Sequence, residues 1–291
     1  MFRAVLILSF ALAFSAHAQE FATSFESSEV APGIYMVSGV GGFGGGNMAI
    51  LVGEDYVAMI DDSMAPLAPT LLAHVAETAG RPVNFMINTH VHGDHVGGNA
   101  QFAENGTIIF AHDNIRKRLV ADPSEAGGEG GLPVVTFAEG VTFHLNGIEA
   151  RVIHLPAAHT DGDAIIHFPA VNVIQTGDIL FTGMFPFIDL DSGGSVSGYI
   201  AAQEKILSMA DDATTIMPGH GDLADKSDLR ESLDMLIDSR ALVKALVDAG
   251  QGEEEIVAAN PLARYHETYN WSFITTEKMT RTLYRDLASG D

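Results

Sequence analysis

Short apolar runs alternate along the chain with longer stretches in which apolar residues recur at helical spacing. The short runs are rich in Val, Ile, Met and Ala and are bounded by Gly, Pro, Asn or Asp, a pattern typical of strands. They predict strands at 33–38, 48–52, 57–60, 83–88, 107–111, 150–155, 164–168, 171–175 and 214–217. The longer stretches predict helices at 66–79, 95–103, 113–119, 197–209, 227–249 and 275–287. Because strands and helices alternate throughout, the pattern favours an α/β fold of stacked layers.

The start of the chain has a different pattern. Arg3 precedes an almost wholly apolar run over 4–14, and Ala16-His17-Ala18 has the small-x-small form of a signal-peptidase site. We therefore expect residues 1–18 to be a cleaved signal peptide and the protein to be periplasmic. The alternative, a membrane anchor, requires roughly 20 apolar residues. After signal cleavage no membrane association is expected.

The remainder, 19–291, is expected to form a single domain, because no linker or change in composition divides it. One segment rich in Gly and acidic residues, 122–131, is expected to be a mobile loop between a helix and a strand.

The composition narrows the range of partners. The chain has 38 acidic and 15 basic residues, a formal net charge of −23. Nucleic acids are bound mainly by Lys and Arg, so no nucleic-acid partner is expected, and anionic membrane surfaces are disfavoured for the same reason. The chain has no Cys, which removes disulfides, thiolate nucleophiles and thiolate metal ligands together. The oligomeric state is not indicated by the sequence.

The strongest chemical signal is Thr89-His90-Val91-His92-Gly93-Asp94-His95, which directly follows an apolar run. In an extended segment His90 and His92 project to the same side, so two imidazoles can meet one ion. Gly93 then allows a turn that brings Asp94 and His95 to a neighbouring position. The motif therefore predicts a metal site; a solvated His-rich loop is the alternative.

Three further candidate ligands stand at the ends of later strand runs. They are His159 in Ala158-His159-Thr160, Asp178 in Thr176-Gly177-Asp178, and His220 in Pro218-Gly219-His220-Gly221. Each is weak alone, since Gly-Asp is commonly a turn and a loop His is commonly a surface residue. Their order supports them, because loops at one edge of the sheet are where α/β folds gather their sites.

Together, His90-x-His92-x-Asp94-His95, His159, Asp178 and His220 resemble the metallo-β-lactamase superfamily across nearly all of the chain after the signal peptide. The resemblance implies an αββα sandwich with a one- or two-metal site at the sheet edge. It implies that the first metal is bound by His90, His92 and His159, and the second by Asp94, His95 and His220. Asp178 matches the bridging carboxylate of glyoxalase II and related members, where the best-known β-lactamase subclass has Cys.

Five imidazoles and two carboxylates favour zinc, two ions per chain, with iron or manganese as alternatives. Two divalent ions lower the pKa of a shared water toward about 7 and hold the oxyanion of the reaction. Asp94 is then expected to be catalytic by accepting a proton of that metal-bound hydroxide. Asp61, after the run 57–60, matches a family aspartate that supports a ligand histidine; an ordinary turn residue is the alternative.

Substrate contacts are indicated more weakly. Phe43 lies in the Gly-rich run 39–47, where relatives carry a flap over the groove; a plain flexible connection is the alternative. In the Cys-containing lactamases a Lys three positions after the Cys holds the substrate carboxylate, but here that position is Phe181. Ser192 and Ser195 are candidates for a hydrogen bond to such a carboxylate, with capping of the following helix as the alternative.

The expected function is that of an exported dinuclear zinc hydrolase that opens an amide or ester carbonyl of a small molecule, with a β-lactam favoured because β-lactams act in the periplasm. The main alternative is a lactonase or esterase of the same superfamily, which Asp178 favours. A third hypothesis is a non-catalytic periplasmic metal-binding protein, which predicts bound metal without turnover.

Overall fold

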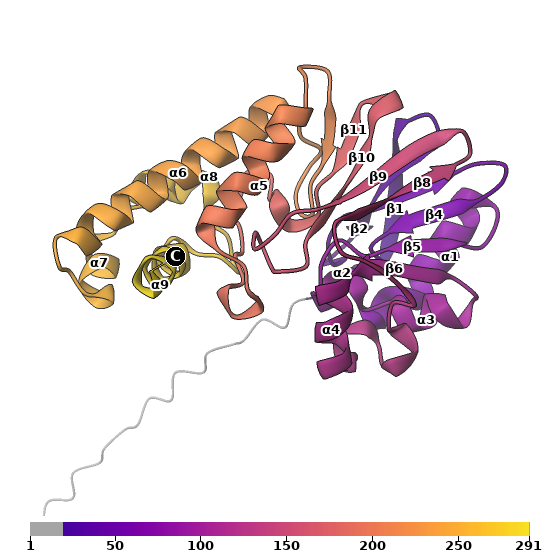
Figure 1. The fold of residues 1–291 in the computed structure, drawn as a ribbon, viewed down its shortest axis with the longest axis horizontal. Coiled ribbons are helices and arrows are strands. Elements are labelled where there is room, and N and C mark those ends of the chain that lie inside the picture. Colours follow the sequence, from indigo (N-terminus) through magenta and orange to yellow (C-terminus); the bar gives the residue numbers. More distant parts are fainter. Residues whose placement is uncertain (1–19, 291) are drawn as a thin grey trace, which may run out of the picture.

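The computed structural model describes residues 20–290, so the predicted signal peptide, 1–18, lies outside the described residues. Two β-sheets pack face to face, and helices cover the outer face of each sheet (Figure 1). This is the αββα arrangement expected from the sequence.

The first sheet has seven strands in chain order, from β1 to β7. They are β1 (Ser24–Ala31), β2 (Ile34–Val40), β3 (Met48–Val52), β4 (Val57–Ile60), β5 (Phe85–Ile87), β6 (Ile108–His112) and β7 (Val135–Phe137). Strands β1 to β4 are antiparallel neighbours, whereas β4 to β7 run parallel. The parallel strands need crossovers, which contain α1 (Ala68–Ala79), α2 (Gly93–Val96), α3 (Asn99–Glu104) and α4 (Asp113–Ala121).

The second sheet has five strands in the order β12-β11-β10-β9-β8. They are β8 (Gly140–Leu145), β9 (Ile148–His154), β10 (Ala164–Phe168), β11 (Val173–Gln175) and β12 (Thr215–Met217). Only β11 and β12 are parallel, and their crossover contains α5 (Val196–Met209). The loops that follow β5, β11 and β12 meet at one edge of the sandwich.

The main core lies between the sheets, where alternate residues of the two sets of strands face each other. Its fully buried members include Ile34 and Ile87 from the first sheet and Ile166 and Phe168 from the second. Outside the sheets, α1 packs on one face through Leu71 and α5 packs on the other through Ile206. Burial on both faces explains why the central strands read as continuous apolar runs.

The C-terminal part forms a separate helical cluster beside the second sheet (Figure 1). It consists of α6 (Lys226–Asp248), α7 (Glu253–Ala259), α8 (His266–Tyr269) and α9 (Thr276–Ser289). Helix α6 starts with a capping box in which Asp225 and Asp228 exchange hydrogen bonds with backbone N–H groups. Within residues 20–290, no helix is both long and apolar enough to span a membrane.

Every predicted strand and helix has a counterpart, but two predicted segments differ. The predicted helix 95–103 is divided into α2 and α3 at Gly97 and Gly98, where a Cβ would lie 2.4 Å and 2.6 Å from the backbone oxygens of Gly93 and Asp62. The segment 122–131, expected to be a mobile loop, instead folds into two 3₁₀ helices, Pro123–Ala126 and Glu129–Gly131. Ala126 is completely buried, which holds this segment on the protein.

Candidate metal centre

The His-rich motif lies at the edge of the sandwich, immediately after β5. His92 has extended backbone angles and α2 begins at Gly93, so the chain turns inside the motif as its sequence predicts. The rings of His90 and His92 are 5.0 Å apart, and that of His90 is 4.2 Å from His95. His90 and His95 are almost completely buried, which makes the alternative of a solvated His-rich loop wrong.

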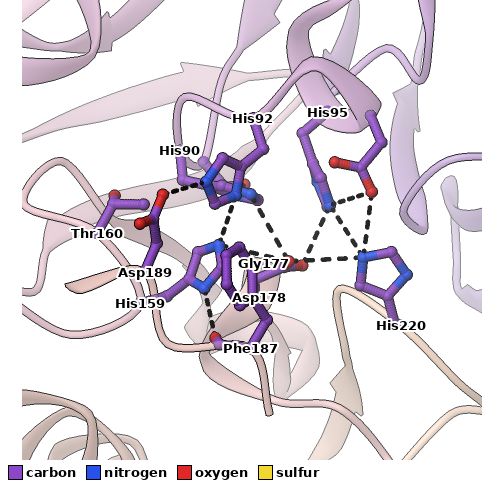
Figure 2. A network of polar contacts seen from close by, with 12 residues as sticks. His90, His92, His95, His159, Thr160, Gly177, Asp178, Phe187, Asp189 and His220 are labelled. Carbon is purple, nitrogen blue, oxygen red and sulfur yellow. Dashed lines mark hydrogen bonds and ion pairs between the residues drawn. The ribbon is translucent and has the colours of Figure 1, made fainter. Parts of the chain in front are cut away.

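One group of donors consists of His90, His92, His159 and Asp178, whose ligand atoms all lie within 4.8 Å of one another (Figure 2). His159 Nε2 lies 2.8 Å from His92 Nδ1 and 3.5 Å from Asp178 Oδ2. His90 Nε2 is buried without a hydrogen-bond partner in the described part of the chain, 3.7 Å from Asp178 Oδ2. A buried imidazole nitrogen that has no hydrogen-bond partner and faces other donors is suited to bind a divalent cation.

The second group consists of Asp94, His95 and His220. His220 Nε2 lies 3.4 Å from Asp94 Oδ2 and 3.4 Å from His95 Nε2. Asp178 joins the two groups, because its Oδ1 is 3.1 Å from His95 Nε2 and its Oδ2 is 3.5 Å from His220 Nε2 (Figure 2). All seven residues singled out from the sequence as ligands are thus brought together, around one carboxylate.

The electrostatics of the protein alone divide these histidines into two kinds. Burial, reinforced by the neighbouring His92, lowers the pKa of His159 to about 4. Burial also opposes the charged form of His220, but Asp178 and Asp94 outweigh it and raise its pKa to about 9. Burial opposes ionisation of Asp94 as well, yet the neighbouring His95 and His220 lower its pKa to about 2. In the protein alone, the buried carboxylates are thus compensated by protons on neighbouring imidazoles, which a divalent cation can replace.

Asp61 supports His95 from outside the cluster, as the sequence led us to expect. Its Oδ2 lies 2.8 Å from His95 Nδ1, and the same carboxylate accepts hydrogen bonds from the N–H and the hydroxyl of Thr89. Asp61 directly follows β4 and has a φ of 59°, in the left-handed region. The ring of His95 is thereby fixed with Nε2 facing the other donors.

Two hydrogen bonds that orient candidate ligand histidines were not predicted from the sequence. His92 Nε2 donates to Asp189 Oδ2 at 3.0 Å, and His159 Nδ1 donates to the carbonyl of Phe187 at 2.7 Å (Figure 2). Both acceptors lie on the loop between β11 and α5. No ligand-like spacing marks Asp189, which is 97 positions after His92.

A cavity of about 650 Å³ opens over the donors. Its floor carries His92, Asp94, Asp178 and His220, and its walls are formed by Phe43, Phe181, Phe187, Trp271, Ser272 and Phe273. This size and mixture of apolar walls and a few polar groups is typical of small-molecule sites. The aromatic residues of the C-terminal region, Trp271 and Phe273, were not predicted as site residues.

Phe43 lies where a substrate residue was expected, stacked on His220 with ring centroids 6.2 Å apart. The Gly-rich run that carries it is tied to the centre, since Gly46 N donates to the Asp94 carbonyl and Asn47 N to that of Gly219. Ser192 and Ser195 do not line the cavity. Ser195 instead caps α5 by accepting from Gly198 N, because its hydroxyl is directed toward the helix end.

The metallo-beta-lactamase superfamily profile matches residues 41–243, most of the chain, so the protein belongs to this superfamily. The structure is also similar to that of a metallo-beta-lactamase from Pontibacter korlensis, with a TM-score of 0.63 and 19% identity, covering 74% of this chain and 100% of that one. The predicted family and fold are confirmed.

Curated relatives are similar over shorter regions. A 2,4-dinitroanisole O-demethylase subunit alpha of Nocardioides sp. (strain JS1661) is 28% identical over 48% of this chain and 41% of its own length. A hydroxyacylglutathione hydrolase of Gloeobacter violaceus is 31% identical over 45% of this chain and 50% of its own. A metallo-beta-lactamase type 2 of Bacillus cereus is 22% identical over 65% of this chain and 72% of its own. The matches to the first two span half of those proteins or less. The predicted class, a metal-dependent hydrolase of this superfamily, is supported, while the substrate has to be argued from the site.

Proposed function

We propose that this protein is an exported dinuclear zinc hydrolase that opens an amide or ester carbonyl, with β-lactams as the favoured substrate. The observation that carries the proposal is the convergence of two donor groups on Asp178 at the floor of an apolar cavity. Export rests on the predicted signal peptide. Hydrolysis of β-lactams in the periplasm would give antibiotic resistance.

His90, His92 and His159 would hold one zinc ion, Asp94, His95 and His220 the other, and Asp178 would contact both. When bound, the ions would supply a water molecule of lowered pKa and polarise the carbonyl under attack. Asp94, which His95 and His220 keep ionised at neutral pH, would accept a hydrogen bond from the attacking water and orient it toward the carbonyl. Phe181 and Phe187 exclude bulk water from the reacting carbonyl, which strengthens these charge interactions.

A lactonase or esterase is the second candidate, and Asp178 favours it. A carboxylate at this position is the feature by which the chain resembles glyoxalase II, and a hydroxyacylglutathione hydrolase is among its relatives. A non-catalytic metal-binding protein is disfavoured, because a large open cavity over the donors serves no purpose in metal storage.

The test uses zinc-loaded protein on a chromogenic cephalosporin, a carbapenem, acyl lactones, lactoylglutathione and a phosphodiester. We expect cephalosporin turnover that EDTA abolishes and that Asp94→Asn or His92→Ala lowers by at least about 100-fold. His144→Ala, which changes an exposed histidine on β8, is the matched control. Turnover of lactones or thioesters alone would establish the second candidate. Bound zinc without any turnover would leave only the metal-binding protein.

A further inference from the structure

A cation lies against two of the aromatic residues that wall the cavity, Phe273 and Phe187. Lys278, in the first turn of α9, places its Nζ 3.8 Å from the ring centroid of Phe273 and 5.5 Å from that of Phe187. Both rings line the cavity. Phe187 connects this ammonium to the donors, because its ring centroid lies 5.5 Å from Lys278 Nζ and 5.5 Å from the ring centroid of His92.

Among the residues that the structure describes, Lys278 has no acidic partner within ion-pair distance, in contrast to Arg281 on the same helix. The chain has 38 carboxylates, and its neighbour on α9, Arg281, pairs with Glu253, Glu254 and Glu277. Within residues 20–290, no carboxylate lies within ion-pair distance of the Lys278 ammonium, which rests on two aromatic rings instead. Partial burial lowers its pKa, as expected for an ammonium that has lost water without gaining an anion.

A series of ring contacts leads from the donors to this cation. The ring of Phe181 lies 4.9 Å from that of His220 and 6.1 Å from that of Trp271. The ring of Phe273 lies 5.6 Å from that of Trp271 and 3.8 Å from the Lys278 ammonium. Resting on the proposed function, we propose that Lys278 binds an anionic group of the substrate, and that the substrate is a carbonyl compound with a flat apolar group between the reacting carbonyl and that anion. Carboxylated β-lactams and acidic thioesters belong to this class, whereas neutral alkyl lactones do not.

Trp271 supplies a direct measurement that needs no turnover. It is the only tryptophan in the chain, and its ring centroid lies 5.6 Å from that of Phe273. A ligand that enters the cavity should therefore change the fluorescence of this one residue. The probes are 3-phenylpropanoate and its neutral analogue 3-phenylpropanamide, titrated into the zinc-loaded protein.

We expect the acid to bind about five-fold more tightly than the amide, the strength of a partly exposed ion pair. Lys278→Met, which retains the apolar stem, should remove this preference, and Lys278→Arg should retain it. Lys205→Met, which removes an exposed charge on α5, is the matched control and should behave as the wild type. Circular dichroism checks that each variant is folded.

Equal binding of the two probes to the wild type, or no binding of either, would overturn the inference. So would a preference for the acid that persists in Lys278→Met, because the carboxylate would then be bound elsewhere, such as at the zinc ions. The proposed function fails separately, through absence of hydrolysis in the substrate panel, and the fluorescence result remains decisive for Lys278 in that case.

Discussion

Asp189 accepts a hydrogen bond from Nε2 of His92 at 3.0 Å, while Nδ1 of the same ring faces His159 Nε2 at 2.8 Å. The carboxylate fixes the tautomer, because a proton held on Nε2 leaves Nδ1 unprotonated and free to bind a metal. Asp189 is itself held by the backbone N–H groups of Asp191 and Ser192. The loop after β11 therefore positions a ligand on the opposite side of the site.

Asp189→Ala should weaken zinc binding about 10- to 100-fold, because His92 then loses its preferred tautomer and orientation. Asp189→Asn retains an oxygen acceptor and should weaken it less. Chelator competition gives the affinities, and the visible spectrum of the cobalt-substituted protein reports the ligand geometry. Equal affinities in the wild type and Asp189→Ala would show that the hydrogen bond does not position His92.

Zinc uptake should release protons. The pKa of His220 is raised to about 9 in the metal-free protein, so below that pH its ring carries a proton that zinc must displace. The apparent affinity should therefore fall as the pH is lowered from about 9 to 6. Calorimetry in buffers of different ionisation enthalpy counts the protons, and His220→Ala should release fewer. An affinity that does not vary with pH would contradict this assignment.

A buried carboxyl outside the proposed ligand set should make stability depend on pH. Asp163 accepts hydrogen bonds from the backbone and hydroxyl of Thr160, next to His159, and burial raises its pKa to about 7. The folded state thus keeps a proton that the unfolded state releases near pH 3.8, and the free energy of unfolding of the metal-free protein should fall as pH rises between these values. The loss is on the order of 4 kcal/mol.

Asp163→Asn removes this titration while keeping a group of the same shape. The free energy of unfolding of the variant, compared with that of the wild type, should therefore be higher at about pH 8 than at about pH 5. Denaturant unfolding of both proteins with EDTA at the two values measures the difference. Curves that shift in parallel with pH would show that Asp163 is not the group responsible.

The parts of this structure that the sequence predicts are those formed by residues close together in the chain. The His-rich motif carries four candidate ligands within the six residues His90 to His95, and the buried central strands are continuous apolar runs. Strand β1 was missed because its sequence, SFESSEVA, is mostly polar, and only Phe25 is fully buried. The short strand β7, strand β8 and helices α7 and α8 were missed as well, being brief or without a clear period.

The remaining site residues could not be predicted, because tertiary packing alone brings them to the cavity. Asp189, Trp271 and Lys278 have no spacing that relates them to the His-rich motif, and each arrives on a loop or helix from a distant part of the chain. Ser195 was a candidate both for a substrate contact and for a helix cap. In the structure it lies directly before α5 and forms the cap.

The glycine at position 46 should be essential for the second group of donors. A Cβ added there would lie 2.0 Å from Cε1 of His95, a ring that Asp61 already fixes from the other side. Gly46→Ala should therefore displace His95 and lower the zinc content toward one ion per chain, since a packed site cannot absorb this overlap. Metal analysis after gel filtration measures the content. Gly130→Ala, where an added Cβ meets no atom within 4 Å, is the control. Two zinc ions retained in Gly46→Ala with unchanged affinity would mean that His95 does not require its observed position.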